Sequence, residues 1–172
     1  LKKFLGNNFD VHFRKIFINN NKNLYVTLVY VNDLVNKGSI NDYILKPFIQ
    51  ELNTRNIKTQ KQAIELVEDG EIYYAYQTKI IDIEEAIDSI LDGYTILVFD
   101  KLKVAFSFDT KNFDKRKVSE STSENIFKAA KDAFVETLNT NISLVRNRTK
   151  SKNLIIEKVF IGTETKTSIA II

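Results

Sequence analysis

Cysteine is absent from this 172-residue sequence, and histidine occurs once, at His12. Without cysteine the chain forms no disulfide, no zinc-thiolate site and no thiol nucleophile, and a single histidine excludes a cluster of histidine ligands. The sequence also lacks a glycine-rich phosphate loop and the pattern of a catalytic triad. These absences argue against a hydrolase or transferase, so we expect no enzyme activity, no cofactor and no metal.

Long apolar runs are absent as well. None approaches the length of about eighteen residues that a membrane helix needs, and the first residues lack the positive-then-apolar pattern of a signal peptide. The sequence contains no methionine and ends on the apolar run 168–172. We therefore expect a soluble, uncleaved segment that has been excised from a longer protein.

The residues that are present supply balanced charge and enough apolar side chains for a core. The 25 Lys and Arg and the 22 Asp and Glu leave a net charge of +3, which does not predict binding to nucleic acid. Hydrophobic residues make up 44% of the chain. A chain of this length and composition can bury a core, as one domain or as two small ones that share an interface.

The hydrophobic pattern predicts a mixed α/β fold. Residues 24–31 are almost continuously apolar, β-branched or aromatic, which is typical of a central strand buried on both faces. Asp82 with Glu85, and Gly93 after the last apolar position, predict a capped helix over 82–91. Further strands are expected at 11–17, 71–81, 95–99, 104–108, 154–161 and 167–172, and further helices at 2–8, 39–52 and 60–67. We expect two small α/β subdomains with mixed sheets, residues 1–78 and 79–172.

One long amphipathic helix is expected from about Ser121 to Arg148. Apolar residues recur there at every fourth position, and Ser121 with Glu124 matches a capping box. Arg146 and Arg148 place positive charge at the end where the helix dipole is negative. We expect this helix to be unbroken and to pack on the sheet of the second subdomain. Its apolar positions are Ile126, Ala130, Phe134, Leu138, Ile142 and Val145.

A series of short strings along the chain resembles one known family. In order, they are Asp10-Val-x-Phe13, Ile90-Leu-Asp-Gly93, Arg116-x-Val118-x-Glu120, Glu124-x-Ile126, Ala133-Phe-Val-Glu136, Thr140-Asn-Ile142 and Leu144-x-Arg146-x-Arg148. Over nearly the whole sequence they resemble the A subunit of bacterial spore germinant receptors, the GerA spore germination family. The chain departs from that family at Ser121, where proline is frequent, and at Lys128-Ala129-Ala130, where Arg-Gly-Pro is frequent. Losing these helix breakers favours the unbroken helix.

The resemblance implies the soluble N-terminal domain of a membrane-embedded receptor subunit. Its partners would be the B and C subunits and other A subunits, with the membrane reached through a downstream segment. The location implied is the inner spore membrane, with this domain on the cytoplasmic side, and the role implied is signal coupling or assembly during nutrient-triggered germination. The alternative is that a cleft between the two subdomains binds a small-molecule germinant directly.

Eight polar residues of the resembling strings are candidates for ligand or subunit contacts. For the glutamates, the alternative is a solvated helix face. Thr140 and Asn141, poor helix formers in mid-helix, predict either a structural hydrogen bond or an interface contact. The two last arginines, with Lys150 and Lys152, either complement the helix dipole or meet lipid headgroups. The candidates are Arg116, Glu120, Glu124, Glu136, Thr140, Asn141, Arg146 and Arg148.

Overall fold

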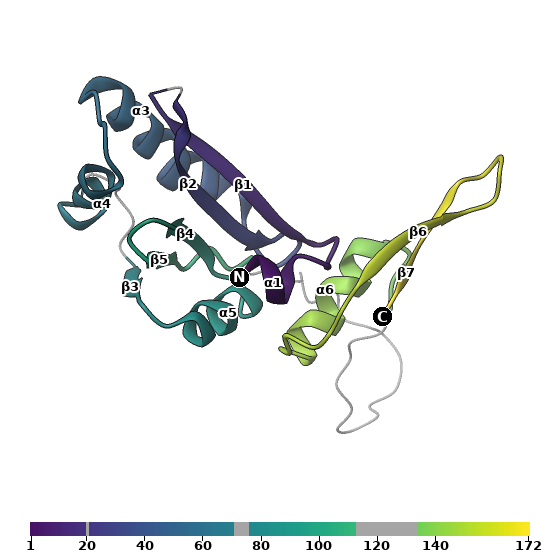
Figure 1. Ribbon diagram of the computed structural model, residues 1–172. Helices are drawn as coiled ribbons and strands as arrows, with labels where there is room; N and C mark the ends of the chain where they lie inside the picture. Colours follow the sequence, from purple (N-terminus) through teal and green to yellow (C-terminus); the bar gives the residue numbers. More distant parts are fainter. Residues whose placement is uncertain (20, 71–75, 113–133) are drawn as a thin grey trace, which may run out of the picture.

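The computed structural model describes residues 1–19, 21–70, 76–112 and 134–172 of the chain. These residues form a five-stranded sheet with helices on both faces, followed by a helix and a two-stranded hairpin (Figure 1). The predicted fold class, mixed α/β, is confirmed. The expected mixed sheets are wrong, since every strand pair in both sheets is antiparallel. Three of these pairs join strands that are consecutive in sequence, and short turns connect antiparallel strands only.

The strands of the large sheet lie in the order β1-β2-β4-β5-β3. The expected strand 24–31 lies within β2, between β1 and β4, which confirms it as an inner strand. Its successive residues enter two different cores, because Leu28 packs on one face of the sheet and Val29 on the other. The bounds are β1 Val11–Ile18, β2 Asn21–Val31, β3 Gln77–Ile80, β4 Thr95–Phe99 and β5 Val104–Phe108.

One face of the sheet is covered by a continuous helical stretch and a further helix. The stretch comprises α2 (Lys37–Ser39), the π-helical turn η1 (Ile40–Leu45) and α3 (Lys46–Thr54), and α4 (Gln60–Glu68) follows. Pro47 is the second residue of α3, directly after the widened turn. Because proline has no N–H and its ring crowds the preceding turn, a wider turn is a favourable way to accommodate it within a continuing helix.

The other face is covered in part by two helices, α1 (Lys2–Leu5) and α5 (Ile83–Leu91). The capped helix expected at 82–91 is confirmed. The Asp82 carboxylate accepts a hydrogen bond of 3.2 Å from the backbone N–H of Glu85. After the helix, Gly93 adopts a φ of +87°, in the left-handed region that glycine enters without strain.

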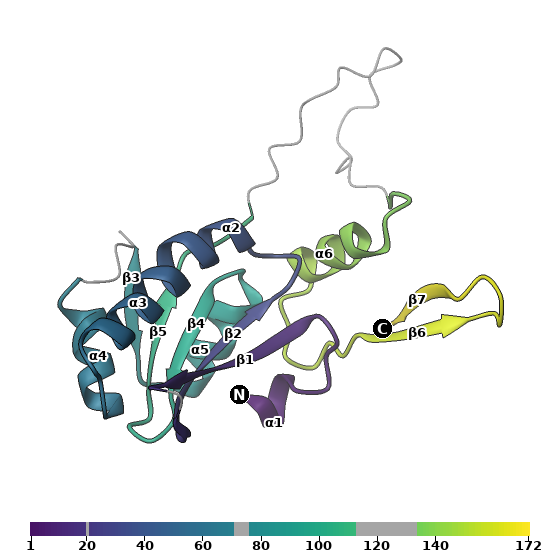
Figure 2. The ribbon, with the colours of Figure 1, turned by 90° about the horizontal axis from the view of Figure 1, so that it is seen from above.

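The last described elements lie beside the sheet rather than within it. They are α6 (Leu138–Arg148) and the hairpin of β6 (Glu157–Ile161) and β7 (Thr167–Ile171). Figure 2 shows the hairpin extending away from the large sheet, with α6 between them. Helix α6 contacts β7, so this hairpin is the second sheet against which the helix lies.

The unbroken helix expected over 121–148 is wrong. Its helical part begins at Leu138, and residues 134–137 are not helical; residues 121–133 lie outside the described part of the chain. The Asn141 side chain accepts from the Val135 N–H and donates to the Val135 carbonyl, both at 2.7 Å. These bonds satisfy the Val135 backbone outside a helix, and Phe134 of the predicted stripe is 71% exposed.

Hydrogen bonding in the large sheet does not follow the expected boundary at residue 78. Strands β1 and β2 precede that residue, β4 and β5 follow it, and β3 spans it. A division of the chain into folding units at 78/79 stays a prediction, while the strands on either side of it share one sheet.

Candidate functional site

The structure describes five of the eight candidate residues. Arg116, Glu120 and Glu124 lie outside the described residues. Glu136 is exposed in the segment before α6. The remaining four candidates, Thr140, Asn141, Arg146 and Arg148, all lie on α6.

Asn141 and Thr140 have different surroundings. The paired hydrogen bonds of Asn141 to Val135 close the turn that leads into α6, so its side chain has the structural role that was one of the two interpretations. The Thr140 carbonyl accepts a hydrogen bond of 2.8 Å from the Ser143 hydroxyl. Its half-buried side chain lines a polar pocket described below.

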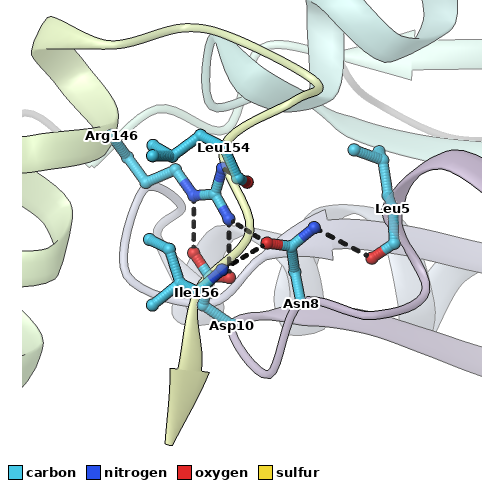
Figure 3. Close-up of polar contacts among 6 residues, drawn as sticks. All are labelled: Leu5, Asn8, Asp10, Arg146, Leu154 and Ile156. Carbon is cyan, nitrogen blue, oxygen red and sulfur yellow. Dashed lines mark hydrogen bonds and ion pairs between the residues drawn. The ribbon is translucent and has the colours of Figure 1, made fainter. Parts of the chain in front are cut away.

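Arg146 and Asp10 are the two buried charged residues among those described, and the Arg146 side chain is 1% exposed. Its Nε donates to Asp10 Oδ2 at 2.8 Å, and its Nη2 donates to Asp10 Oδ1 at 3.0 Å (Figure 3). The Asp10 side chain is fully buried. A bidentate geometry of this kind fixes the orientation of both side chains.

Asn8 extends the ion pair into a network. Its Oδ1 accepts from Arg146 Nη2 at 2.7 Å and from the Ile156 backbone N–H at 2.9 Å. Arg146 Nη1 donates to the Leu154 carbonyl at 3.0 Å, and the Phe9 N–H donates to the Ile156 carbonyl at 3.1 Å. We call Asn8, Asp10, Arg146, Leu154 and Ile156 the Arg146 network. It joins the entry to β1, the end of α6 and the entry to β6.

The network changes the interpretation of Arg146 and adds residues that the sequence did not indicate. Arg146 neither complements the helix dipole at the surface nor is free to meet lipid, because Asp10 and Asn8 occupy its donors inside the protein. The sequence does not identify Asn8 as a site residue, and it marks Asp10 only within the string Asp10-Val-x-Phe13. The available signal was a lone carboxylate just before an apolar strand, where a buried partner is needed.

A second set of ion pairs lies at the surface between α5 and the segment after α6. The Asp92 carboxylate accepts from Lys111 Nζ at 2.5 Å and also from Lys150 Nζ. Partial burial acts to raise the pKa of Asp92, but the hydrogen bonds from the two lysines outweigh it, so the pKa lies below its ordinary value. Lys152 pairs with Glu84 of α5 at 2.6 Å. Lys150 and Lys152 therefore form ion pairs within the protein, Lys150 with Asp92 and Lys152 with Glu84.

A polar pocket of about 390 Å³ lies between the turn after β2 and α6. Amide, hydroxyl and charged side chains dominate its lining. One of them is Asp33, and burial raises the pKa of its carboxyl group above the ordinary value, although Lys37 and Asn32 act to lower it. Thr140 is the one candidate residue in this lining. Its polar lining residues are Asn32, Asp33, Asn36, Lys37, Asn112, Asn139, Thr140 and Ser143.

Two further properties concern the described residues alone. They contain no group of three or more His, Asp and Glu side chains placed to hold a metal ion. None of their helices is both long enough and apolar enough to cross a bilayer.

The described residues thus form an antiparallel α/β fold with one buried ion-pair network and a polar pocket. The chain belongs to the Bacillus/Clostridium GerA spore germination protein family, whose model matches residues 1–172. The resemblance seen in the sequence is thereby confirmed.

Individual relatives agree with the family. The chain is 28% identical over 172 residues to spore germination protein B1 of Bacillus subtilis, covering 99% of this chain and 34% of the relative. It is 25% identical over 170 residues to spore germination protein KA of the same organism, covering 99% of this chain and 30% of the relative. The chain thus spans about a third of the length of these relatives.

The fold is shared with a solved structure. The crystal structure of the N-terminal domain of the A subunit of the Bacillus megaterium spore germinant receptor GerK3 matches with a TM-score of 0.72 and 24% identity. The match covers 98% of this chain and 59% of that one. This likeness shows the fold of a germinant receptor N-terminal domain.

Proposed function

We propose that this chain is the N-terminal domain of an A subunit in a nutrient germinant receptor, and that it couples the receptor's response to the rest of the subunit without catalysis. The receptor would lie in the inner spore membrane with the B and C subunits, and this domain would lie on the cytoplasmic side. Family membership, relatives of about three times this length and a relative named as a membrane protein support the proposal.

The observation that carries the coupling role is the Arg146 network. It joins the entry to β1 to the end of α6 and the entry to β6, the first strand of the hairpin. A buried ion pair is a weak contributor to net stability but a strict constraint on geometry, because either charge left alone in the interior is strongly destabilising. A displacement of β1 is therefore transmitted to α6 and the hairpin instead of being absorbed between them.

The test is germination of spores that carry the Asp10→Val/Arg146→Met pair in the full-length subunit. This pair removes both charges together, so the domain folds but loses the constraint on how its parts sit. We expect slower nutrient-triggered germination at an unchanged subunit level in the membrane. The control is Lys166→Gln at the exposed hairpin turn. Wild-type germination by the Asp10→Val/Arg146→Met spores would remove the support for coupling.

A second candidate function is direct binding of a small polar germinant in the pocket beside Thr140. The lining of amides, hydroxyls, one carboxylate and one ammonium suits a zwitterionic or polyhydroxylated molecule, because each of its polar groups can be paired on entry. The pocket is lined by residues of the segment 32–37, which precedes residue 78, and by Asn112 and the first part of α6, which follow it. The cleft expected between the two subdomains would likewise have one wall from each side of residue 78.

Calorimetry of the chain with amino acids, sugars and nucleosides tests this function. We expect heat of binding for at least one class, and its loss in Thr140→Val but not in Thr149→Val, which removes an exposed threonine outside the pocket. An absence of heat with all three classes would exclude the binding function and leave the coupling function intact.

A further inference from the structure

The polar pocket beside Thr140 has two walls that come from separate parts of the chain. One wall consists of residues of the segment 32–37, which follows β2, together with Asn112, and the other is the first part of α6. The first wall is fixed to the strands of the large sheet, because the Asn112 N–H donates to the Leu34 carbonyl at 2.8 Å. This wall therefore moves with the sheet, whereas the second moves with the helix.

The two walls are joined at one end of α6, outside the pocket. Arg146 lies one helical turn beyond Ser143 of the lining, about 4.5 Å along the helix axis. Its guanidinium binds the Asp10 carboxylate, and the Asp10 carbonyl accepts from the backbone N–H of Asn32 in the first wall at 2.8 Å. Asp10 therefore contacts α6 through its side chain and the first wall of the pocket through its backbone.

The pocket separates the walls at the other end of the helix. Among the described residues, no hydrogen bond or ion pair joins the α6 residues of the lining to the segment 32–37. The Ser143 hydroxyl instead donates to the Thr140 carbonyl within the helix. Asp33 and Lys37 place a carboxylate and an ammonium on the facing wall. A polar molecule in the pocket can therefore bond to both walls at once, which the protein's own side chains do not do there.

We propose that occupation of the pocket and the Arg146 network stabilise one another through α6. The inference rests on the proposed binding function of the pocket and concerns its regulation. A molecule that bonds both walls attaches α6 to the sheet near Thr140, about 9 Å along the helix from Arg146. A rigid helix transmits restraint from one end to the other, and such coupling between two sites is reciprocal. Arg146 is then a positioning residue for the pocket, although it does not line it.

The test uses the absence of cysteine from the chain, which makes Thr140→Cys its single thiol. Methanethiosulfonate reagents attach to this thiol either an aminoethyl arm or a propyl arm of the same length. The ammonium of the aminoethyl arm can pair with Asp33 across the pocket, and the propyl arm cannot. The readout is hydrogen exchange at the Ile156 amide, which donates to Asn8 of the network. We expect this exchange to be at least about fivefold slower with the aminoethyl arm than with the propyl arm.

Two controls show whether the effect passes through the pocket and the network. On Thr149→Cys, at the end of the same helix but outside the pocket, the two arms should give equal exchange at Ile156. In Thr140→Cys combined with Asp10→Val/Arg146→Met, the difference between the arms should disappear. Equal exchange with the two arms on Thr140→Cys, or a difference that survives the loss of the network, would overturn the proposal.

Calorimetry with a free ligand separates this proposal from the binding function itself. The class of amino acids, sugars or nucleosides that gives heat with the wild type should bind at least about fivefold more weakly to Asp10→Val/Arg146→Met, and equally well to Lys166→Gln. Unchanged affinity in Asp10→Val/Arg146→Met would overturn the coupling and leave the binding function intact. An absence of heat in the wild type would exclude the binding function alone, because the tethered arms measure the coupling without a free ligand.

Discussion

Replacing Arg146 by methionine is the perturbation that most sharply tests the role of the buried network. The substitution keeps the apolar stem of the side chain inside the protein and removes the guanidinium. The Asp10 carboxylate, which is fully buried and accepts two hydrogen bonds from that guanidinium, then has no cationic partner. The Asn8 side chain loses its bond to Arg146 and keeps two others, because its Oδ1 still accepts from the Ile156 N–H and its Nδ2 still donates to the Leu5 carbonyl.

The expected cost follows from leaving one buried charge alone. Removing one partner of a buried ion pair destabilises a protein by about 3–5 kcal/mol, whereas replacing both with apolar side chains is often neutral or stabilising. For a chain of this size each 1 kcal/mol shifts the Tm by about 2–4 °C, so Arg146→Met should lower the Tm by at least about 6 °C. Asp10→Val/Arg146→Met should recover most of that loss.

The assay is urea unfolding followed by circular dichroism for the wild type, the two single variants and the double variant. The double-mutant cycle should show that the two substitutions are strongly non-additive, since the residues are in direct contact. If Arg146→Met costs less than about 1 kcal/mol, or if the two substitutions simply add, the network is not the constraint described here.

Three further predictions concern features outside the network. Asn141→Ala should lower the free energy of unfolding by about 1 kcal/mol, measured by urea denaturation. The variant loses two hydrogen bonds to Val135, and the cost is small because both bonds are exposed and water replaces them. Gly93→Ala should destabilise the protein by at least about 1 kcal/mol, because alanine is strained at a φ of +87° and its Cβ would lie 3.1 Å from the Leu34 carbonyl oxygen. A comparison of its Tm with that of Gly38→Ala measures this cost. Because the pKa of Asp92 is lowered in the folded protein, its ionised carboxylate stabilises the fold at pH values above the ordinary pKa of 3.8. This stabilisation is lost as the pH falls through the lower pKa of the folded state. The difference in Tm between the wild type and Asp92→Asn should therefore shrink in acid, and a difference that is constant from pH 2 to 7 would contradict the ion pairs with the two lysines.

Elements with local signals were predictable from the sequence. The strand β2 is marked by its own composition, and α5 carries a capping carboxylate at one end and a left-handed glycine at the other. Helix α6 was misplaced because spacing by four residues also describes Phe134, which is exposed and precedes the helix. The side chain of Asn141 decides that boundary, and its partner lies on the non-helical side.

The site was less predictable than the fold because its contacts join distant parts of the chain. Arg146 and Asp10 are 136 positions apart, and neither side chain reveals from sequence which of the many opposite charges it meets. The basic end of α6 therefore resembled a solvated helix terminus. Arg148, two residues further on, does lie at the surface, so adjacent arginines of one string have opposite environments.

Amide hydrogen exchange at Ile156 tests most directly whether the segment after α6 is held to the sheet. The Ile156 N–H donates to Asn8 and its carbonyl accepts from Phe9, although this residue lies outside the strands of the described chain. We predict that this amide is protected nearly as well as that of Val29 in β2, and that Arg146→Met loses this protection under conditions where Val29 stays protected. Fast exchange of Ile156 in the wild type, at the rate of an exposed loop, would contradict it.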